Sequence, residues 1–168
     1  MDNMLPVFGM MIGIPGSGKT SWIAKQPTID HDGCTYIRTP FGEFHVLSPD
    51  ERRKKLSNIT DQSRNAEIWQ EITDHAVTCL KHFTNVLIDA TNVQTTPRKK
   101  MLSRLPECKK VALIFNTDPV VACGRIKADL EANKERAAVP DEIVYRMYGD
   151  FLYTMRVLHA EGFETFSC

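Results

Sequence analysis

The chain has 168 residues, of which 42% are apolar and 25% charged, the proportions of an ordinary globular protein. This length predicts one domain that covers residues 1–168 and is large enough for a proper core. The 21 basic and 21 acidic side chains give a formal net charge of zero. This balance argues against a protein that coats long nucleic acids through many phosphate contacts.

Nothing in the sequence predicts a secreted or membrane-bound protein. The five cysteines are odd in number and widely spaced, without a C-x-x-C pair, which favours reduced thiols over a disulfide framework or a zinc site. The N-terminus lacks the features of a signal peptide, and no apolar run approaches the length of a membrane span. We therefore expect a soluble, cytoplasmic protein with no membrane partner.

The first predicted elements form a strand, a glycine-rich loop and a helix. Leu5–Ile12 is an apolar run without charge, typical of a buried parallel strand, and Ser21–Lys25 is typical of a helix. Between them, the loop fits G-x-x-x-x-G-K-[S/T], in which glycines let backbone N–H groups turn toward phosphate oxygens. We expect it to bind a nucleotide through Gly13, Pro15, Gly16, Ser17, Gly18, Lys19 and Thr20.

The predicted elements then continue to alternate. Residues 26–33 are expected to be irregular. Cys34–Arg38 predicts one arm of an added hairpin, and Phe44–Leu47 predicts a strand of the main sheet. Further strands are predicted at 86–88, 110–115 and 163–166, and further helices from 48, over 64–82, 97–105 and 118–133, and from 140. Together, these elements predict an α/β fold with a central parallel sheet between helices. In such folds ligands bind at the carboxyl ends of the strands.

Three side chains at this edge have the chemistry of phosphate transfer. Lys19 is a candidate catalytic residue because the lysine of such a loop reaches the β- and γ-phosphates of a nucleotide, while the hydroxyl of Thr20 binds Mg²⁺. ATP and Mg²⁺ are therefore the expected ligands. Asp89 ends the buried run Val86–Ile88 and has the position of a second magnesium ligand. It is also placed to cap the turn that follows.

A second carboxylate is predicted beside the first. Ser48 caps a helix that begins at Pro49, directly after the strand at Phe44–Leu47. Asp50 is then placed to accept or orient the proton of an acceptor hydroxyl, and Arg53, one turn later, to hold an acceptor phosphate. Both residues also suit an ordinary helix start.

Cations cluster in a later segment, residues 124–139. Arg125, Lys127, Lys134 and Arg136 flank a polar bend before Pro140. A helical lid rich in arginine closes over the nucleotide in P-loop kinases, and its closure excludes water from the transfer. The segment is therefore a candidate lid. Charged helix ends of this kind also occur without any such role.

The motifs together resemble the P-loop kinase family that includes the 5′-kinase domain of phage polynucleotide kinase and its small relatives. The similar segments span nearly the whole chain: GIPGSGKT (13–20), VLSPDERR (46–53), ITDQSRNAEIWQEI (59–72), LIDATN (87–92) and AAVPDEIVYRMYGDF (137–151). Two segments depart from the family, since residues 26–44 are longer than usual and the lid between Arg125 and Pro140 is stretched.

The resemblance implies roles for single residues. Asp50 takes the position of the general base and Arg53 that of an acceptor-phosphate ligand. Asp89 and Asn92 match the D-x-T-N strand end, and Arg98 matches one of a basic pair, so that all three are expected to contact the acceptor. In the lid, Arg125 is expected to contact the nucleotide and Arg136 to act as a catalytic cation.

The expected activity is an ATP-dependent transfer of the γ-phosphate to a hydroxyl of a nucleic acid, most simply a 5′-OH end of DNA or RNA. One alternative is a kinase of a hydroxymethylated base, such as 5-hydroxymethyluracil, in phage DNA. Another is a kinase of a small molecule such as a nucleoside or metabolite. A nucleotide-dependent switch without transfer activity is the third. Neither the fold nor the phosphate-binding loop separates the kinase alternatives.

Overall fold

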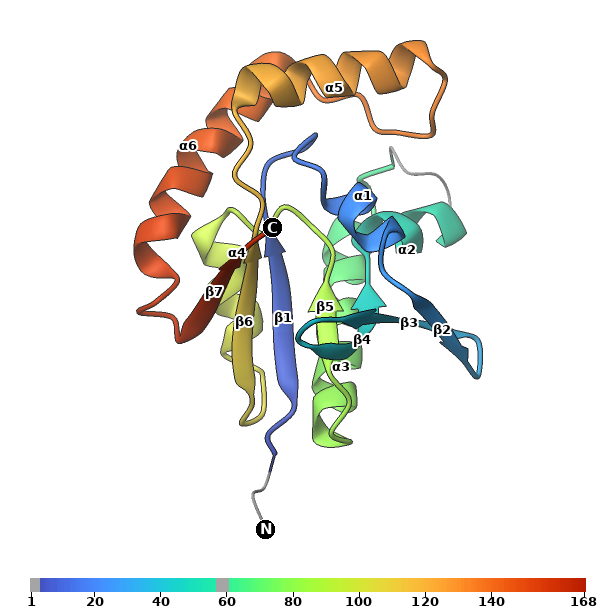
Figure 1. Cartoon of the computed structure of the whole chain (residues 1–168), viewed down its shortest axis with the longest axis vertical. Helices are drawn as coiled ribbons and strands as arrows, with labels where there is room; N and C mark the ends of the chain where they lie inside the picture. Colours follow the sequence, from blue (N-terminus) through green and yellow to red (C-terminus); the bar gives the residue numbers. More distant parts are fainter. Residues whose placement is uncertain (1–3, 57–60) are drawn as a thin grey trace.

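The computed structural model describes residues 4–56 and 61–168, and in these ranges the chain forms one sheet with helices around it (Figure 1). The first two residues of the segment 59–72 lie outside the described residues. The strands are β1 (Val7–Ile12), β2 (Thr28–His31), β3 (Cys34–Thr39), β4 (Gly42–Leu47), β5 (Val86–Ile88), β6 (Lys109–Ile114) and β7 (Phe163–Ser167). The helices are α1 (Lys19–Ala24), α2 (Pro49–Leu56), α3 (Asn65–Lys81), α4 (Thr95–Leu102), α5 (Pro119–Glu131) and α6 (Asp141–Val157).

The sheet has the order β2-β3-β4-β5-β1-β6-β7. Strands β4, β5, β1, β6 and β7 pair in parallel, and β2 and β3 extend the sheet as an antiparallel hairpin beside β4. Strand β1 lies between β5 and β6, and its residues Phe8, Met10, Met11 and Ile12 are almost fully buried. A strand flanked and covered on both faces is apolar throughout, as its sequence predicted. The predicted α/β fold with an added hairpin is therefore confirmed.

The hairpin is longer than predicted because residues 26–33 are not irregular. Strand β2 pairs with β3, with Ile29 opposite Tyr36. The two residues between these strands, Asp32 and Gly33, have positive φ angles of 50° and 77°. An Asp-Gly pair favours this two-residue turn because its backbone twist matches that of the strands. The Asp-Gly signal was in the sequence and predicts the missing strand.

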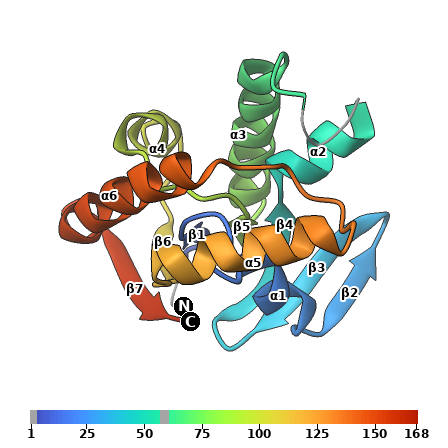
Figure 2. The ribbon, with the colours of Figure 1, turned by 90° about the horizontal axis from the view of Figure 1, so that it is seen from above.

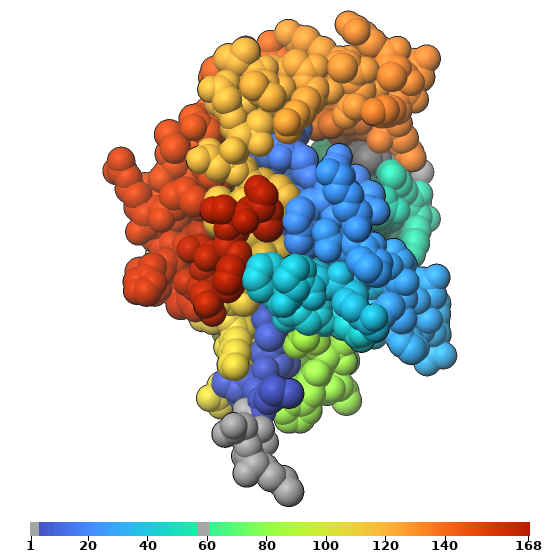
Figure 3. All heavy atoms as spheres, viewed as in Figure 1, coloured from blue at the N-terminus to red at the C-terminus, as the bar shows by residue number. Residues whose placement is uncertain are grey.

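Two apolar clusters hold the sheet. The larger one lies on the face covered by α3, α4 and α6, and the smaller one lies on the opposite face under Trp22 and Ile23 of α1 (Figure 2). The hairpin also covers this second face. Phe41, in the turn between β3 and β4, contacts Phe166 of β7 with ring centroids 4.4 Å apart, and Figure 3 shows this turn against the C-terminal segment.

The carboxyl ends of β1, β4 and β5 meet at one edge, below α5 (Figures 1 and 2). The loop after β5 is hydrogen-bonded to the ends of both neighbouring strands, β4 and β1. Asp89 N donates to Leu47 O (2.9 Å), and Thr91 O accepts from Gly13 N (3.1 Å). The segments that carry the predicted site residues are thus hydrogen-bonded to one another at this edge. No helix in the described part of the chain is long and apolar enough to span a membrane.

Candidate active site

The glycine-rich loop has the conformation of a phosphate cradle. Gly16 and Gly18 have φ angles of 78° and 98°, which favour glycine, and Gly18 directly precedes α1. Lys19 folds back over the loop, and its Nζ donates to Gly13 O (2.8 Å), Ile14 O (2.9 Å) and the hydroxyl of Ser17 (3.2 Å). The ammonium group therefore lies inside the loop that precedes the helix, where a bound phosphate would replace these acceptors.

Lys19 and Asp89 form the electrostatic centre of the site. Burial lowers the pKa of Lys19 to about 8, although the nearby carboxylate of Asp89 opposes this shift. Burial also raises the pKa of Asp89 to about 6, with Lys19 opposing and Asp50 adding to the rise. The positive charge of Arg136 also lowers the pKa of Lys19. The protonation states of Lys19 and Asp89 are thus sensitive to the charge of a ligand that binds nearby.

Asp50 and Arg53 are held together at the start of α2. Ser48 caps this helix, with its Oγ accepting from Glu51 N at 3.4 Å, as predicted. Arg53 Nη1 donates to Asp50 Oδ1, and Arg53 Nη2 donates to Asn65 Oδ1 of α3 at 2.8 Å. The guanidinium is buried, whereas the carboxylate is exposed. Asn65 is a site residue that the sequence did not single out.

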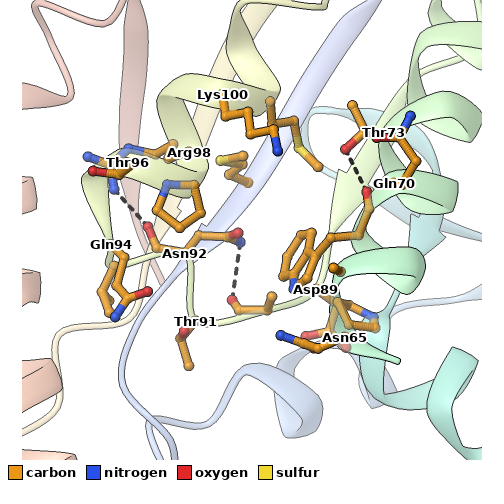
Figure 4. A pocket seen from close by; sticks show the side chains of 18 of the residues that line it. Asn65, Gln70, Thr73, Asp89, Thr91, Asn92, Gln94, Thr96, Arg98 and Lys100 are labelled. Atoms are coloured by element: carbon orange, nitrogen blue, oxygen red, sulfur yellow. Dashed lines mark hydrogen bonds between the residues drawn. The ribbon is translucent and has the colours of Figure 1, made fainter. Parts of the chain in front are cut away.

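A cleft of about 580 Å³ opens between these residues and α4. Asp50, Asp89 and Trp69 line one part of it, and Lys100 and Arg104 line another. Figure 4 shows Asp89 and Asn65 facing the residues of α4 across this space. Trp69 is partly buried and packs against the larger apolar cluster, so it supports the core and also forms a wall of the cleft.

Arg98 of the basic helix is expected to contact the acceptor and is among the residues that line this cleft, but its guanidinium is bonded within the protein. Arg98 is 2% exposed. Its guanidinium makes a two-pronged ion pair with Glu161, with Nε–Oε2 at 2.6 Å and Nη2–Oε1 at 3.1 Å, and Nη1 donates to Asn92 O at 2.8 Å. The guanidinium nitrogens of Arg98 therefore all donate to groups of the protein itself. We do not include Arg98 among the acceptor ligands proposed below.

Lys100 and Arg104 replace Arg98 as the cations of the cleft. They share a helical face with Pro97 and Met101, which also line the space. The spacing 97, 100, 101 and 104 is that of one side of a helix, so periodicity alone indicates that these residues lie together. The family resemblance, in contrast, concerns the adjacent basic pair at residues 98 and 99.

Asn92 braces the edge of the sheet. Its φ is 52°, and its Nδ2 donates to Met11 O (2.8 Å), Ala90 O (3.2 Å) and Ile88 O (3.3 Å), the second of which Figure 4 draws. Asparagine tolerates this backbone conformation better than most residues. The side chain lines the cleft, but its amide nitrogen joins β5 to β1. It thereby fixes Asp89 relative to the phosphate loop.

The predicted lid lies above the loop. Arg125 of α5 donates from Nη1 to Gly16 O at 3.2 Å, and Arg136 donates from Nη1 to Asp129 at 2.6 Å. Lys54 of α2 pairs with Glu135 at 3.3 Å, which connects the lid to the helix that carries Asp50. The segment consists of the second half of α5 and the loop that leads to α6. The bounds of 124–139 stay a prediction.

Two arginines of the site have unmet donors. Within residues 4–56 and 61–168, the buried side-chain nitrogen and oxygen atoms without a hydrogen-bond partner are Arg53 Nε and Arg136 Nε. A buried donor without a partner costs about 1–3 kcal/mol, so native proteins rarely keep one without a reason. Here both belong to arginines that the sequence predicted to bind phosphate.

The sequence pattern of an AAA domain family (AAA_33) matches residues 9–151, a range that contains the loop, Asp50, Asp89 and the predicted lid. The chain belongs to this family. The predicted P-loop kinase fold is confirmed by the solved structures that the chain resembles. One is described as the structure of the Pnkp1/Rnl/Hen1 RNA repair complex, with a TM-score of 0.72 at 19% identity. The match covers 92% of this chain and 47% of the other, so the chain spans about half the length of that relative.

Two further solved structures with a similar fold are close to this chain in length. A gluconokinase from Sinorhizobium meliloti 1021 has a TM-score of 0.54 at 13% identity, with 98% of this chain and 84% of that one covered. A putative kinase from Chloroflexus aurantiacus has a TM-score of 0.58 at 13% identity, with coverages of 95% and 99%. At such identities the likeness shows the P-loop kinase fold and leaves the substrate open.

Proposed function

We propose that this AAA-domain protein is an ATP-dependent kinase that transfers the γ-phosphate to a hydroxyl of a nucleic acid, most simply a 5′-OH end. The observation that supports it most is the pair of unmet donors. Arg53 lies beside the carboxylate of Asp50, and Arg136 lies near Lys19. Two arginines with spare donors suit one phosphate in the donor and another in the acceptor.

The donor half consists of the loop and the lid. The N–H groups of the loop and the ammonium of Lys19 bind the β- and γ-phosphates of ATP, and Arg125 and Arg136 contact the nucleotide from above. Thr20 and Asp89 offer hard oxygen donors at the start of α1 and the end of β5, which suit Mg²⁺. When bound, the ion neutralises charge on the phosphates.

The acceptor half is the cleft. The Asp50 carboxylate accepts the proton of the acceptor hydroxyl as its oxygen forms a bond to the γ-phosphorus. The bond from phosphorus to the bridging β–γ oxygen breaks, and ADP leaves. Arg53 holds the phosphate of the terminal nucleotide, Trp69 stacks on a base, and Lys100 and Arg104 lie along the strand. An aromatic wall with flanking cations is a common way to bind single-stranded nucleic acid.

The test uses labelled ATP, Mg²⁺ and short DNA and RNA strands that carry a 5′-OH. We expect label at the 5′ end, none on matched strands that already carry a 5′-phosphate, and none with Lys19→Ala. A duplex with 5-hydroxymethyluracil and blocked ends tests the base-kinase alternative. Absence of label on all of these strands, with ATP binding intact, contradicts a nucleic acid as the acceptor.

A small-molecule acceptor is the second candidate, and the size of the cleft favours it. About 580 Å³ lies within the range of pockets that hold one small ligand. Phosphorylation of a nucleoside or sugar in a metabolite panel, with no reaction on oligonucleotides, identifies this alternative. Trp69→Ala separates the two further, since a stacked base loses about 1–3 kcal/mol of binding without its aromatic partner.

A further inference from the structure

A second group of reactive side chains lies away from the phosphate loop, between β4 and α3. The group consists of His45 on β4 together with His75 and Cys79 on α3. Each of the three offers one donor atom, and these atoms all lie within 4.8 Å of one another. Two features of the fold bring them together. His75 and Cys79 are four residues apart, so they share one face of α3. His45 alternates with Phe44 and Val46 along β4, which places it on the opposite side of the sheet from them.

The spacing is close to that of a tetrahedral metal site. Cys79 Sγ lies 3.8 Å from His45 Nδ1. Zinc bonds of about 2.05 Å to nitrogen and 2.3 Å to sulfur require a nitrogen–sulfur separation of about 3.6 Å. The two imidazole rings meet edge to face, with centroids 4.9 Å apart and an interplanar angle of 80°. Small side-chain rotations therefore suffice to direct the three donors at one point.

Cys34 is a candidate for the fourth donor. It begins β3, in the hairpin that pairs with β4. Tyr36, two residues later and on the same side of that strand, lies directly opposite His45. Cys34 thus faces the same side of the sheet as His45. Two imidazoles and two thiolates form a donor set that zinc prefers over magnesium or calcium.

We propose that the protein binds one Zn²⁺ ion through His45, His75 and Cys79, with Cys34 as the fourth ligand. The ion would join the added hairpin to α3. The spacing of the cysteines did not predict this site because its ligands come from three separate elements and not from a C-x-x-C pair. His45 is only 6% exposed, so the ion would be shielded from water on the side of β4.

The role of such an ion is structural. Helix α3 provides Asn65 and Trp69 to the cleft, and Asp50 follows β4 by three residues. Binding of zinc between β4 and the second half of α3 would fix the two walls of the acceptor cleft relative to each other. A closed four-ligand site leaves no position for a substrate, so the ion takes no part in the transfer.

The experiment measures the metal content of the full chain. Protein is purified under reducing conditions, loaded with zinc, passed through a weak chelator and analysed by elemental mass spectrometry. We expect one zinc per chain in the wild type and a loss of affinity of more than about 100-fold in Cys79→Ser and in His75→Ala. Cys108→Ser is the matched control, since Cys108 is also partly buried but lies outside the cluster. It should keep its zinc.

Cobalt substitution gives a readout that does not depend on the folding of a variant. Co²⁺ bound by the wild type should show a thiolate charge-transfer band in the near ultraviolet and the visible bands of tetrahedral coordination. In Cys34→Ser the charge-transfer band should fall to about half, because one thiolate remains. A wild type that retains no more zinc than Cys79→Ser, or that shows no thiolate band with cobalt, overturns the site. An unchanged band in Cys34→Ser overturns the fourth ligand.

Discussion

Asp50 and Arg53 form an ion pair on one turn of α2 in which the cation is buried and the anion is open to the cleft. The side chain of Arg53 is 9% exposed and that of Asp50 is 61% exposed. Arg53 is fixed further by Asn65 of α3. The buried arginine therefore holds the carboxylate in place and leaves it exposed, which suits the general base proposed above.

Replacement of Asp50 by asparagine tests this assignment. Asp50→Asn keeps the shape of the side chain but cannot take a proton, so we expect kcat to fall by about 10²–10⁴ while ATP affinity stays the same. Glu51→Gln is the matched control, because Glu51 is the next residue of the same helix and is also exposed. Single-turnover kinetics and ATP titrations measure both. Unchanged turnover in Asp50→Asn would show that another group takes the proton.

The buried ammonium of Lys19 predicts a dependence of ATP binding on pH. Its pKa is about 8 in the free protein, so the group loses its charge as the pH rises through 8. Bound phosphates favour the charged form, and ATP affinity should therefore fall above pH 8, by up to about tenfold per pH unit. At pH 8, binding should take up about half a proton.

Calorimetry in buffers of different ionisation enthalpy measures this proton uptake. Lys19→Arg is the control for the assignment, because an arginine stays charged throughout the range and its variant should show no uptake. Proton uptake that persists in Lys19→Arg would assign the titration to another group.

Arg136 should matter for the transferred phosphate more than its neighbours in the lid. Arg136→Ala removes a cation near Lys19 together with an unmet buried donor, so we expect kcat to fall by about 10³-fold, as for other arginines that stabilise a phosphoryl transition state. Lys134→Ala removes a cation that pairs with the same residue, Asp129, but lies at the surface. Its kcat should change by less than about twofold. Equal losses in the two variants would mean that the lid acts through its net charge.

Arg98 should contribute to stability and not to binding of the acceptor. Breaking a buried ion pair leaves one charge without a partner, so Arg98→Ala should lower the free energy of unfolding by about 3–5 kcal/mol. Lys99→Ala changes an exposed neighbour and should have little effect. The double variant Arg98→Met with Glu161→Leu should recover much of the stability. Chemical denaturation measures the first effect, and kinase activity of the double variant decides the role: retained activity excludes Arg98 as an acceptor ligand.

The sequence was sufficient for the parts of the site that depend on local patterns. The phosphate loop, the helix start at Ser48 and the strand end at Asp89 each have a short signature, and the structure brings their segments to one edge of the sheet. The partner of Arg98 could not be predicted, since Glu161 lies 63 residues away and the pair forms only when α6 packs against α4. The same holds for the cluster of His45, His75 and Cys79. Contacts between distant elements depend on how the elements pack. No periodicity or spacing in a single sequence indicates them.

The contact of Phe41 with Phe166 has a consequence for the synthesis of the chain. The turn between β3 and β4 covers one face of the sheet, but its partner in β7 is synthesised only after the other six strands. Before β7 is synthesised, the apolar surface beneath the turn lacks the contact with Phe166. Strand β6 also has no partner at the edge that β7 later occupies. Nascent chains that stall before β7 should therefore be the form most prone to aggregate and most dependent on chaperones.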